Sequence, residues 1–152
     1  MIHLLDTDML IFMIRGLKPG RRAAQRQRAD ELVERCRRAQ AENDSVGLSA
    51  ITVSELEFGA RNSDRYEVEI TAVHKVLSPF TIYDYDSVSC PRHYGRIRNE
   101  LETQGVAIGS MDLLIAAHAL ALSATIVSNN LAHFSRVAGL QTANWLTRPS
   151  VG

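Results

Sequence analysis

The chain has few cysteines, few lysines and no long apolar run, and each shortage excludes a class of protein. Only Cys36 and Cys90 are cysteines, and they lie far apart without paired metal-ligand spacing, which favours a reduced, cytoplasmic protein over a disulfide-stapled secreted one. The apolar run from Met9 to Ile14 is too short to cross a bilayer, and no basic leader precedes it. We therefore expect no signal peptide and no membrane span.

Net charge is also absent, although the charges are unevenly placed. The 17 basic residues balance 17 acidic residues, so the whole-molecule field gives no argument for binding nucleic acid or acidic membranes. Residues 113–152 contain no Asp or Glu, whereas Arg15 to Arg38 contains nine basic residues and three acids. An acidic site must therefore come from the first three quarters of the chain. The length of 152 residues and 45% hydrophobic content predict a single domain over residues 1–152.

Short apolar runs alternate with helical patterns along the chain. The runs predict strands at residues 2–5, 46–48, 80–83 and 125–127, with an edge strand between 140 and 146. The intervening patterns predict helices after Asp8, over 21–41, from about 49 to 59, and over 70–77, 93–104 and 111–122. This order is typical of an α/β fold, a three-layer α/β/α sandwich with a mainly parallel central sheet.

The first apolar run ends on two acids, Asp6 and Asp8. Ligands in open α/β sheets bind beyond the carboxyl ends of the strands, so a carboxylate at this edge is well placed for chemistry. The alternative is that both acids only turn the chain and cap the next helix, and for Asp8 this alternative is the stronger. Asp6 is therefore the first candidate for a site residue.

Glu55 and Asp112 are the other two candidate acids, and each also has a structural explanation. Thr52-x-x-Glu55 matches a capping box, in which the glutamate binds the backbone at the start of its own helix. Asp112 lies in the first turn of an apolar helix, where the helix dipole stabilises a carboxylate by roughly 0.3 to 1 kcal/mol. All three acids nevertheless fall at one edge of the predicted sheet. Clustered carboxylates stay ionised around a cation, and oxygen ligands suit Mg²⁺ or Mn²⁺, which indicates metal-assisted phosphodiester hydrolysis.

Four motifs in order carry a family resemblance between Met1 and about Trp145. They are Leu4-Leu5-Asp6-Thr7-Asp8, Ser49-x-x-Thr52-x-x-Glu55-Leu56-x-x-Gly59, Ile108-Gly109-x-x-Asp112-Leu113-Leu114-Ile115-Ala116-Ala117-His118-Ala119, and Val127-Ser128-Asn129-Asn130 with Phe134 and Leu140. The chain resembles PIN-domain ribonucleases of the VapC toxin type. The resemblance implies a toxin of a toxin-antitoxin pair that cleaves RNA, commonly structured RNA such as transfer RNA, and that forms homodimers and is held inactive by an antitoxin protein.

The resemblance also implies the residues of the site. Asp6, Glu55 and Asp112 would be the acids of a Mg²⁺ site, with Mn²⁺ as a substitute. The fourth family position, often an acid, falls on Asn130, with Ser128 as its hydroxyl neighbour. A neutral Asn130 argues against a tightly held second metal, because one negative charge is missing.

Two features depart from the commoner form of the family. Ser110-Met111 precedes Asp112 where a pair such as Pro-Asn is frequent, and the basic segment 21–38 is longer than the usual connection. This segment is a candidate contact for the RNA backbone; the alternative is a solvated helix face or an antitoxin clamp. Arg92, Arg96 and Arg98 lie on the helix that leads to Asp112 and are nearer the expected cleft, whereas His118 and His133 are interpreted as structural or surface residues.

Two other functions remain open from the sequence. Asp6-Thr7-Asp8 also resembles the first motif of haloacid-dehalogenase-like phosphatases, which need a lysine near the late acidic motif. Only Lys18 and Lys75 exist, and neither is close to Asp112 in sequence. A catalytically inactive PIN-like domain that binds RNA or protein is the second alternative, although the presence of all three acids argues against it. The apolar residues Met9, Phe12 and Met13, beside the basic helix, are expected to offer a groove for an amphipathic partner.

Overall fold

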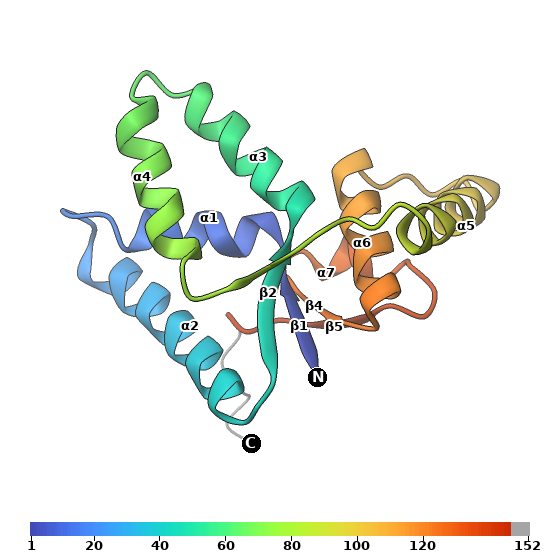
Figure 1. Cartoon of the computed structure of the whole chain (residues 1–152), viewed down its shortest axis with the longest axis horizontal. Helices are drawn as coiled ribbons and strands as arrows, with labels where there is room; N and C mark the ends of the chain where they lie inside the picture. The colour runs from blue at the N-terminus through green and yellow to red at the C-terminus, as the bar shows by residue number, and fades with distance from the viewer. Residues whose placement is uncertain (147–152) are drawn as a thin grey trace.

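A five-stranded sheet forms the centre of the computed structural model, which describes residues 1–146 (Figure 1). Its strands are β1 (Ile2–Leu5), β2 (Ser45–Ser49), β3 (Thr81–Tyr83), β4 (Thr125–Val127) and β5 (Gln141–Ala143). They pair in the order β3-β2-β1-β4-β5, and every pairing is parallel. The predicted parallel sheet and the C-terminal edge strand are confirmed. Because the strands share one direction, their carboxyl ends meet at a single edge.

Helices cover both faces of this sheet. They are α1 (Thr7–Gly16), α2 (Ala23–Ala41), α3 (Ala50–Arg61), α4 (Tyr66–Leu77), α5 (Ser89–Thr103), α6 (Ser110–Leu122) and α7 (Leu131–Phe134). Figure 1 shows α1 to α4 on one side of the strands and α5, α6 and α7 on the other. Both α4 and α5 begin earlier than predicted; at α5 the Asp86 carboxylate accepts hydrogen bonds from the backbone N–H groups of Val88 and Ser89. The short helix α7 was not predicted at all.

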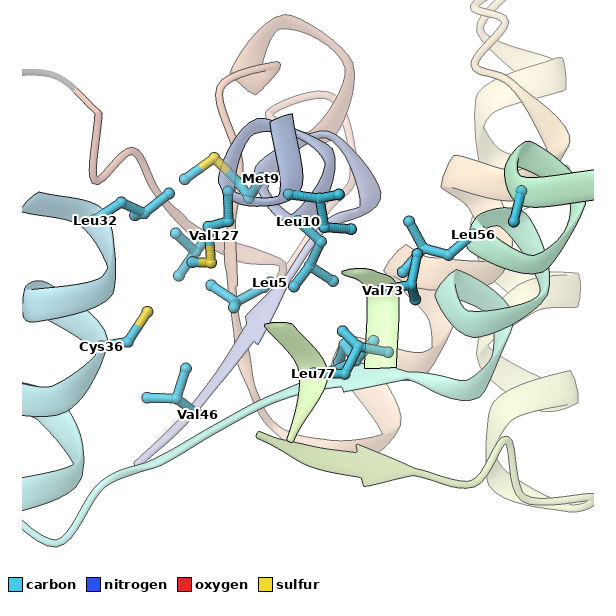
Figure 2. Close-up of a cluster of buried hydrophobic side chains, with 14 of the residues drawn as sticks. Leu5, Met9, Leu10, Leu32, Cys36, Val46, Leu56, Val73, Leu77 and Val127 are labelled. Carbon is cyan, nitrogen blue, oxygen red and sulfur yellow. The ribbon is translucent and has the colours of Figure 1, made fainter. Parts of the chain in front are cut away.

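The core has two parts because the side chains of a strand point alternately to opposite faces. Leu4 and Ile126 pack with α5 and α6, whereas Leu5 and Val127 pack with α1 to α4. Figure 2 shows the second part, in which Met9 lies among the core side chains. Both faces of the sheet are therefore buried, as the apolar strands predicted.

The expected partner groove at Met9, Phe12 and Met13 is wrong. Met9 and Met13 are fully buried in the core, because α1 turns this face toward the sheet. Phe12 is half-buried, and the guanidinium carbon of Arg28 lies 5.5 Å from the centre of its ring. Met9 and Met13 are therefore not available to a partner helix.

The basic helix α2 lies against α1 and β2 (Figure 1). Gly16 permits this packing, since a Cβ on it would lie 2.5 Å from the Cβ of Ala29. Two of its arginines stack on aromatic rings of the protein body, Arg28 on Phe12 and Arg35 on Trp145 at 5.3 Å. These arginines serve packing, while an RNA contact by the rest of the segment stays a prediction.

The sequence also led us to expect neither a membrane span nor a disulfide, and the described residues bear on both expectations. None of the helices within residues 1–146 is long and apolar enough to span a membrane. Cys36 and Cys90 are both free thiols, and both are buried.

Candidate active site

Asp6 lies at the carboxyl end of the central strand β1 and is the N-cap of α1. Its Oδ1 accepts a hydrogen bond from the backbone N–H of Met9 at 3.0 Å, and its Oδ2 accepts one from the Ser128 hydroxyl at 2.5 Å. Only 3% of the residue is exposed. Asp8, which the sequence favoured as the cap, is instead exposed in the first helical turn. Capping and a place in the site are therefore combined in Asp6.

Burial perturbs the Asp6 carboxyl strongly. Loss of hydration raises its pKa from 3.8 to about 6, although the hydrogen bonds from Ser128 and Met9 oppose this rise. The negative charges of Asp8 and Asp112 raise the pKa further. No lysine or arginine within residues 1–146 forms an ion pair with this carboxylate. The environment of Asp6 thus favours a cation that would hold the carboxylate ionised.

A line of polar contacts joins Asp6 to Asp112. The Ser128 hydroxyl, which donates to Asp6, accepts a hydrogen bond from the backbone N–H of Asn130 at 2.8 Å. The Asn130 side-chain nitrogen lies 3.0 Å from Nδ1 of His133, and the same Nδ1 lies 3.3 Å from Oδ2 of Asp112. Strand β4, helix α7 and the first turn of α6 are thereby brought to the same edge as β1.

Glu55 does not cap its helix, so the capping-box interpretation is wrong. The N-cap of α3 is Ser49, whose hydroxyl accepts from the backbone N–H of Ile51, and both Thr52 and Glu55 lie inside the helix. The Thr7 hydroxyl instead donates to Oε1 of Glu55 at 2.6 Å. Since Thr7 directly follows Asp6, this bond ties Glu55 to the same edge of the sheet.

The sequence interpretation missed His133 as a neighbour of the site. It lies on α7, three residues after Asn130, so one turn of helix places the Asn130 side chain against His133, and His133 contacts Asp112. Because α7 was not predicted, the three-residue spacing of Asn130 and His133 was not used to place both residues near the site. His118 is buried as expected, and its Nδ1 lies 2.7 Å from the hydroxyl of Ser49. Burial lowers the pKa of His118, which suits a neutral structural imidazole.

The three acids are near neighbours, but their side chains are not gathered around one point. Within residues 1–146, no group of three or more His, Cys, Asp or Glu side chains is arranged to hold a metal ion. Glu55 is turned to Thr7, whereas Asp6 and Asp112 face the contacts through Ser128 and His133. The arrangement therefore offers two aspartates on one side and a separate glutamate beside them.

A small pocket of about 150 Å³ opens next to Glu55, between α1, α3 and α4. Ile11, Ile14 and Leu56 form part of its apolar lining. At its rim Lys18 donates to both carboxylate oxygens of Glu69 at 2.7 Å. Lys18 is thus engaged outside the acidic cluster, where a phosphatase of the haloacid-dehalogenase type would not place it.

Comparison with known proteins agrees with this geometry. The PIN domain family model matches residues 4–140. A Ribonuclease VapC2 of Haemophilus influenzae is 37% identical over 147 residues, covering 95% of this chain and 98% of the relative. A tRNA(fMet)-specific endonuclease VapC of Shigella flexneri is 34% identical over 142 residues, covering 93% and 96%. The crystal structure of VapBC2 from Rickettsia felis, bound to a DNA fragment from its promoter, superposes with a TM-score of 0.83 at 32% identity, covering 95% of this chain and 99% of the other. The chain belongs to the PIN domain family, within its VapC group.

Proposed function

We propose that this chain is a Mg²⁺-dependent endoribonuclease and the toxin of a toxin-antitoxin pair. The observation that carries the proposal is the pair of aspartates joined through Ser128 and His133 at the carboxyl edge of the sheet. The relatives named as ribonucleases supply the reaction, which is hydrolysis of an RNA phosphodiester bond. Transfer RNA is the proposed substrate, as in the name of the Shigella flexneri relative.

The residues present fit a divalent metal with hard oxygen ligands. Mg²⁺ keeps several waters in proteins and needs only one or two carboxylates besides the substrate phosphate. Asp6 and Asp112 would hold it, and its charge would reverse the rise in the pKa of Asp6 that burial causes. Three carboxylates carry a formal charge of −3, so one metal in the free protein nearly balances them. We place a second metal only in the RNA complex, because Asn130 adds no charge.

When bound, the metal supplies charge stabilisation at the phosphoryl oxygen and a more acidic water for in-line attack. Ser128 orients Asp6 by donating to Oδ2, and His133 would orient Asp112 in the tautomer whose Nδ1 carries the proton and donates to Oδ2. Glu55 would add negative charge to the metal site and is proposed to accept the proton of the attacking water on its carboxylate, because the hydrogen bond from Thr7 holds it beside the aspartates. Mn²⁺ should replace Mg²⁺, since both take oxygen ligands.

An antitoxin protein is the proposed partner, together with a second copy of the chain. The VapBC2 structure of Rickettsia felis is that of a complex, which supports the first part. The pocket beside Glu55 is the proposed place of contact, because a side chain entering between Ile11 and Leu56 would meet that carboxylate. Cytoplasmic action in a reducing compartment is also proposed, which the free, buried thiols of Cys36 and Cys90 support.

The test is cleavage of total RNA by the full chain freed of antitoxin, with and without Mg²⁺, followed by mapping of new 5′ ends. We expect discrete cuts that need the metal and that disappear with Asp112→Asn. Cuts that persist in chelator would contradict the metal-dependent mechanism. A wild-type protein that binds RNA but cuts none would support the inactive alternative. The match to the PIN domain family argues against the phosphatase alternative. We accordingly expect the protein not to hydrolyse an aryl phosphate.

A further inference from the structure

A second pocket, of about 170 Å³, lies between α5 and the start of α6. Figure 1 shows these two helices side by side, joined by the segment that follows α5. Leu101 and Leu113 are buried in its lining, and Val106 and Ile108 are half-buried. An apolar cavity of about 150 Å³ is known to accept benzene. The pocket therefore has the size and the lining for one flat ring system.

The mouth of this pocket is polar and aromatic. Arg98 donates from Nε to Oε1 of Glu102 at 2.9 Å and from Nη1 to the hydroxyl of Tyr94 at 3.0 Å. Its guanidinium carbon lies 6.0 Å from the centre of the Tyr94 ring. Within residues 1–146, Nη2 of Arg98 makes no hydrogen bond. Tyr94 and Arg98 together present a ring face, a guanidinium plane and a spare donor.

The pocket lies at the same end of α6 as Asp112. Ser110 lines it and is the first residue of α6, and Asp112 follows two residues later. At a rise of about 1.5 Å per residue, the two positions differ by about 3 Å along the helix axis, and their side chains point to different sides of the helix. Ser110 and Met111 are exposed, so an RNA strand with one phosphate at Asp112 could cross the start of α6 and bring a neighbouring nucleotide to the mouth of the pocket.

We infer that this pocket binds one unstacked base of the RNA, in a nucleotide next to the bond that is cut. The inference rests on the proposed cleavage of RNA at Asp112. Proteins read single-stranded RNA by stacking splayed bases on aromatic rings and guanidinium planes and by hydrogen bonds to the base edges. Tyr94 and Arg98 offer the stacking surfaces, while Glu102 and Ser110 offer polar groups to the edge of the base. A partner helix would need a longer apolar groove than this single-ring pocket.

Helix α5 contains a matched control for Arg98. Arg96 lies two residues earlier, is exposed like Arg98 and pairs with Glu100 at 3.3 Å with the same four-residue spacing. It does not line the pocket. Arg96→Gln and Arg98→Gln therefore remove the same charge and the same kind of helix pair, and only the second changes the pocket.

The test uses a pool of stem–loop RNAs with randomised loops and the full chain freed of antitoxin. Wild type, Arg96→Gln, Arg98→Gln, Tyr94→Phe and Tyr94→Leu are compared by sequencing the cut positions in Mg²⁺. We expect a base preference beside the cut that Arg98→Gln and Tyr94→Leu flatten and that Arg96→Gln and Tyr94→Phe largely keep. Loss of one stacked base should lower kcat/KM by roughly 5- to 150-fold. Thermal unfolding of each variant confirms that it is folded.

An abasic nucleotide at the preferred position completes the test. When the RNA is made abasic, kcat/KM of the wild type should fall by the factor that Tyr94→Leu loses on the intact RNA. The kcat/KM of Tyr94→Leu itself should fall little further on the abasic RNA. Binding of the same RNAs to the Glu55→Gln protein with and without Tyr94→Leu, measured by anisotropy in chelator, gives this comparison without cleavage, so a failure of the nuclease proposal is seen separately. Equal profiles and equal abasic losses in all variants would overturn the inference. Weaker antitoxin binding by Arg98→Gln with an unchanged RNA profile would also overturn it and would assign the pocket to the partner protein.

Discussion

Asp6 and Asp112 are the same kind of side chain at one edge of the sheet, but their surroundings differ. Asp6 is 3% exposed and accepts two hydrogen bonds, and burial raises its pKa to about 6. The Asp112 side chain is 32% exposed, and its contact is with His133 at 3.3 Å. A fixed, dehydrated carboxylate beside an open one gives a metal one rigid anchor and one side from which RNA can enter.

Asp112→Asn should give the largest change in activity. It removes one of the two charges proposed to hold the metal, on the side that faces the substrate, so cleavage should fall by about a thousandfold or more. The melting temperature should stay close to that of the wild type, because Asp112 is half-exposed. Cleavage rates at limiting Mg²⁺ measure the first effect, and unchanged cleavage would remove Asp112 from the site.

Asp6→Asn should lower cleavage to a similar extent, and it should also stabilise the metal-free fold. The folded-state pKa of about 6 lies above the ordinary 3.8, so between these values the folded protein holds the extra proton and stability falls as pH rises. The variant should therefore gain up to about 3 kcal/mol at about pH 7.5 and only about 0.5 kcal/mol near pH 4.

Thermal unfolding in chelator at both pH values measures this effect, with the exposed Asp8→Asn as the control. An equal change in stability at the two pH values would mean that burial does not hold the Asp6 carboxyl protonated.

Glu55→Gln separates chemistry from folding. Glutamine can still accept the hydrogen bond from Thr7, and the N-cap of α3 is Ser49, so stability should not change. Loss of the proton acceptor should slow cleavage by about a hundredfold. Glu57→Gln on the same helix, which removes the charge but keeps an acceptor for the Tyr66 hydroxyl, is the control and should stay active. Equal rates for the two variants would contradict the role of Glu55.

His133→Gln tests whether the open aspartate is oriented by its neighbour. Loss of a residue that positions a metal ligand typically lowers metal affinity by about 10- to 100-fold. Mn²⁺ affinity should fall within this range, while the fold is kept because the His133 side chain is 44% exposed. An unchanged affinity would leave His133 as a surface residue, as the sequence suggested.

Asn130→Asp should have the smallest effect and the opposite sign. The added charge lies in the line of contacts between Asp6 and Asp112, so Mn²⁺ should bind about tenfold tighter and the Mg²⁺ requirement should fall. Asn129→Asp adds the same charge one residue earlier, on an exposed side chain that bonds to Asn144. Equal affinities in these two variants would mean that Asn130 does not face the metal.

The sequence predicted the sheet and the positions of the acids because both depend on short local patterns. Apolar runs followed by Asp6 or Ser128 specify a buried strand and a polar residue at its end, and a parallel sheet then brings those ends together. Local sequence patterns gave the wrong prediction where two residues compete for the same N-cap position. The Thr52-x-x-Glu55 pattern is a valid capping box in sequence, but α3 begins at Ala50 with Ser49 as its N-cap, close to the predicted start near 49, so Thr52 and Glu55 lie inside the helix.

Contacts between elements that are far apart along the chain also could not be predicted from the sequence. Helix α7 has four residues, too few for a hydrophobic period, so the place of His133 beside Asp112 could not be read from it. The burial of Met9 and Met13 likewise depends on which side of α1 meets the sheet. The pocket at Tyr94 and Arg98 needs α5 and α6 side by side, which no spacing along the chain expresses.

Calorimetric titration of Mn²⁺ into the wild type, Asp6→Asn and Asp112→Asn proteins, freed of antitoxin, tests the central claim most directly. If the buried and the open aspartate share one metal, the wild type should bind one Mn²⁺ per chain. Either substitution should then weaken that binding together with RNA cleavage. Wild-type affinity and stoichiometry in either variant would contradict the shared site, whatever happened to cleavage.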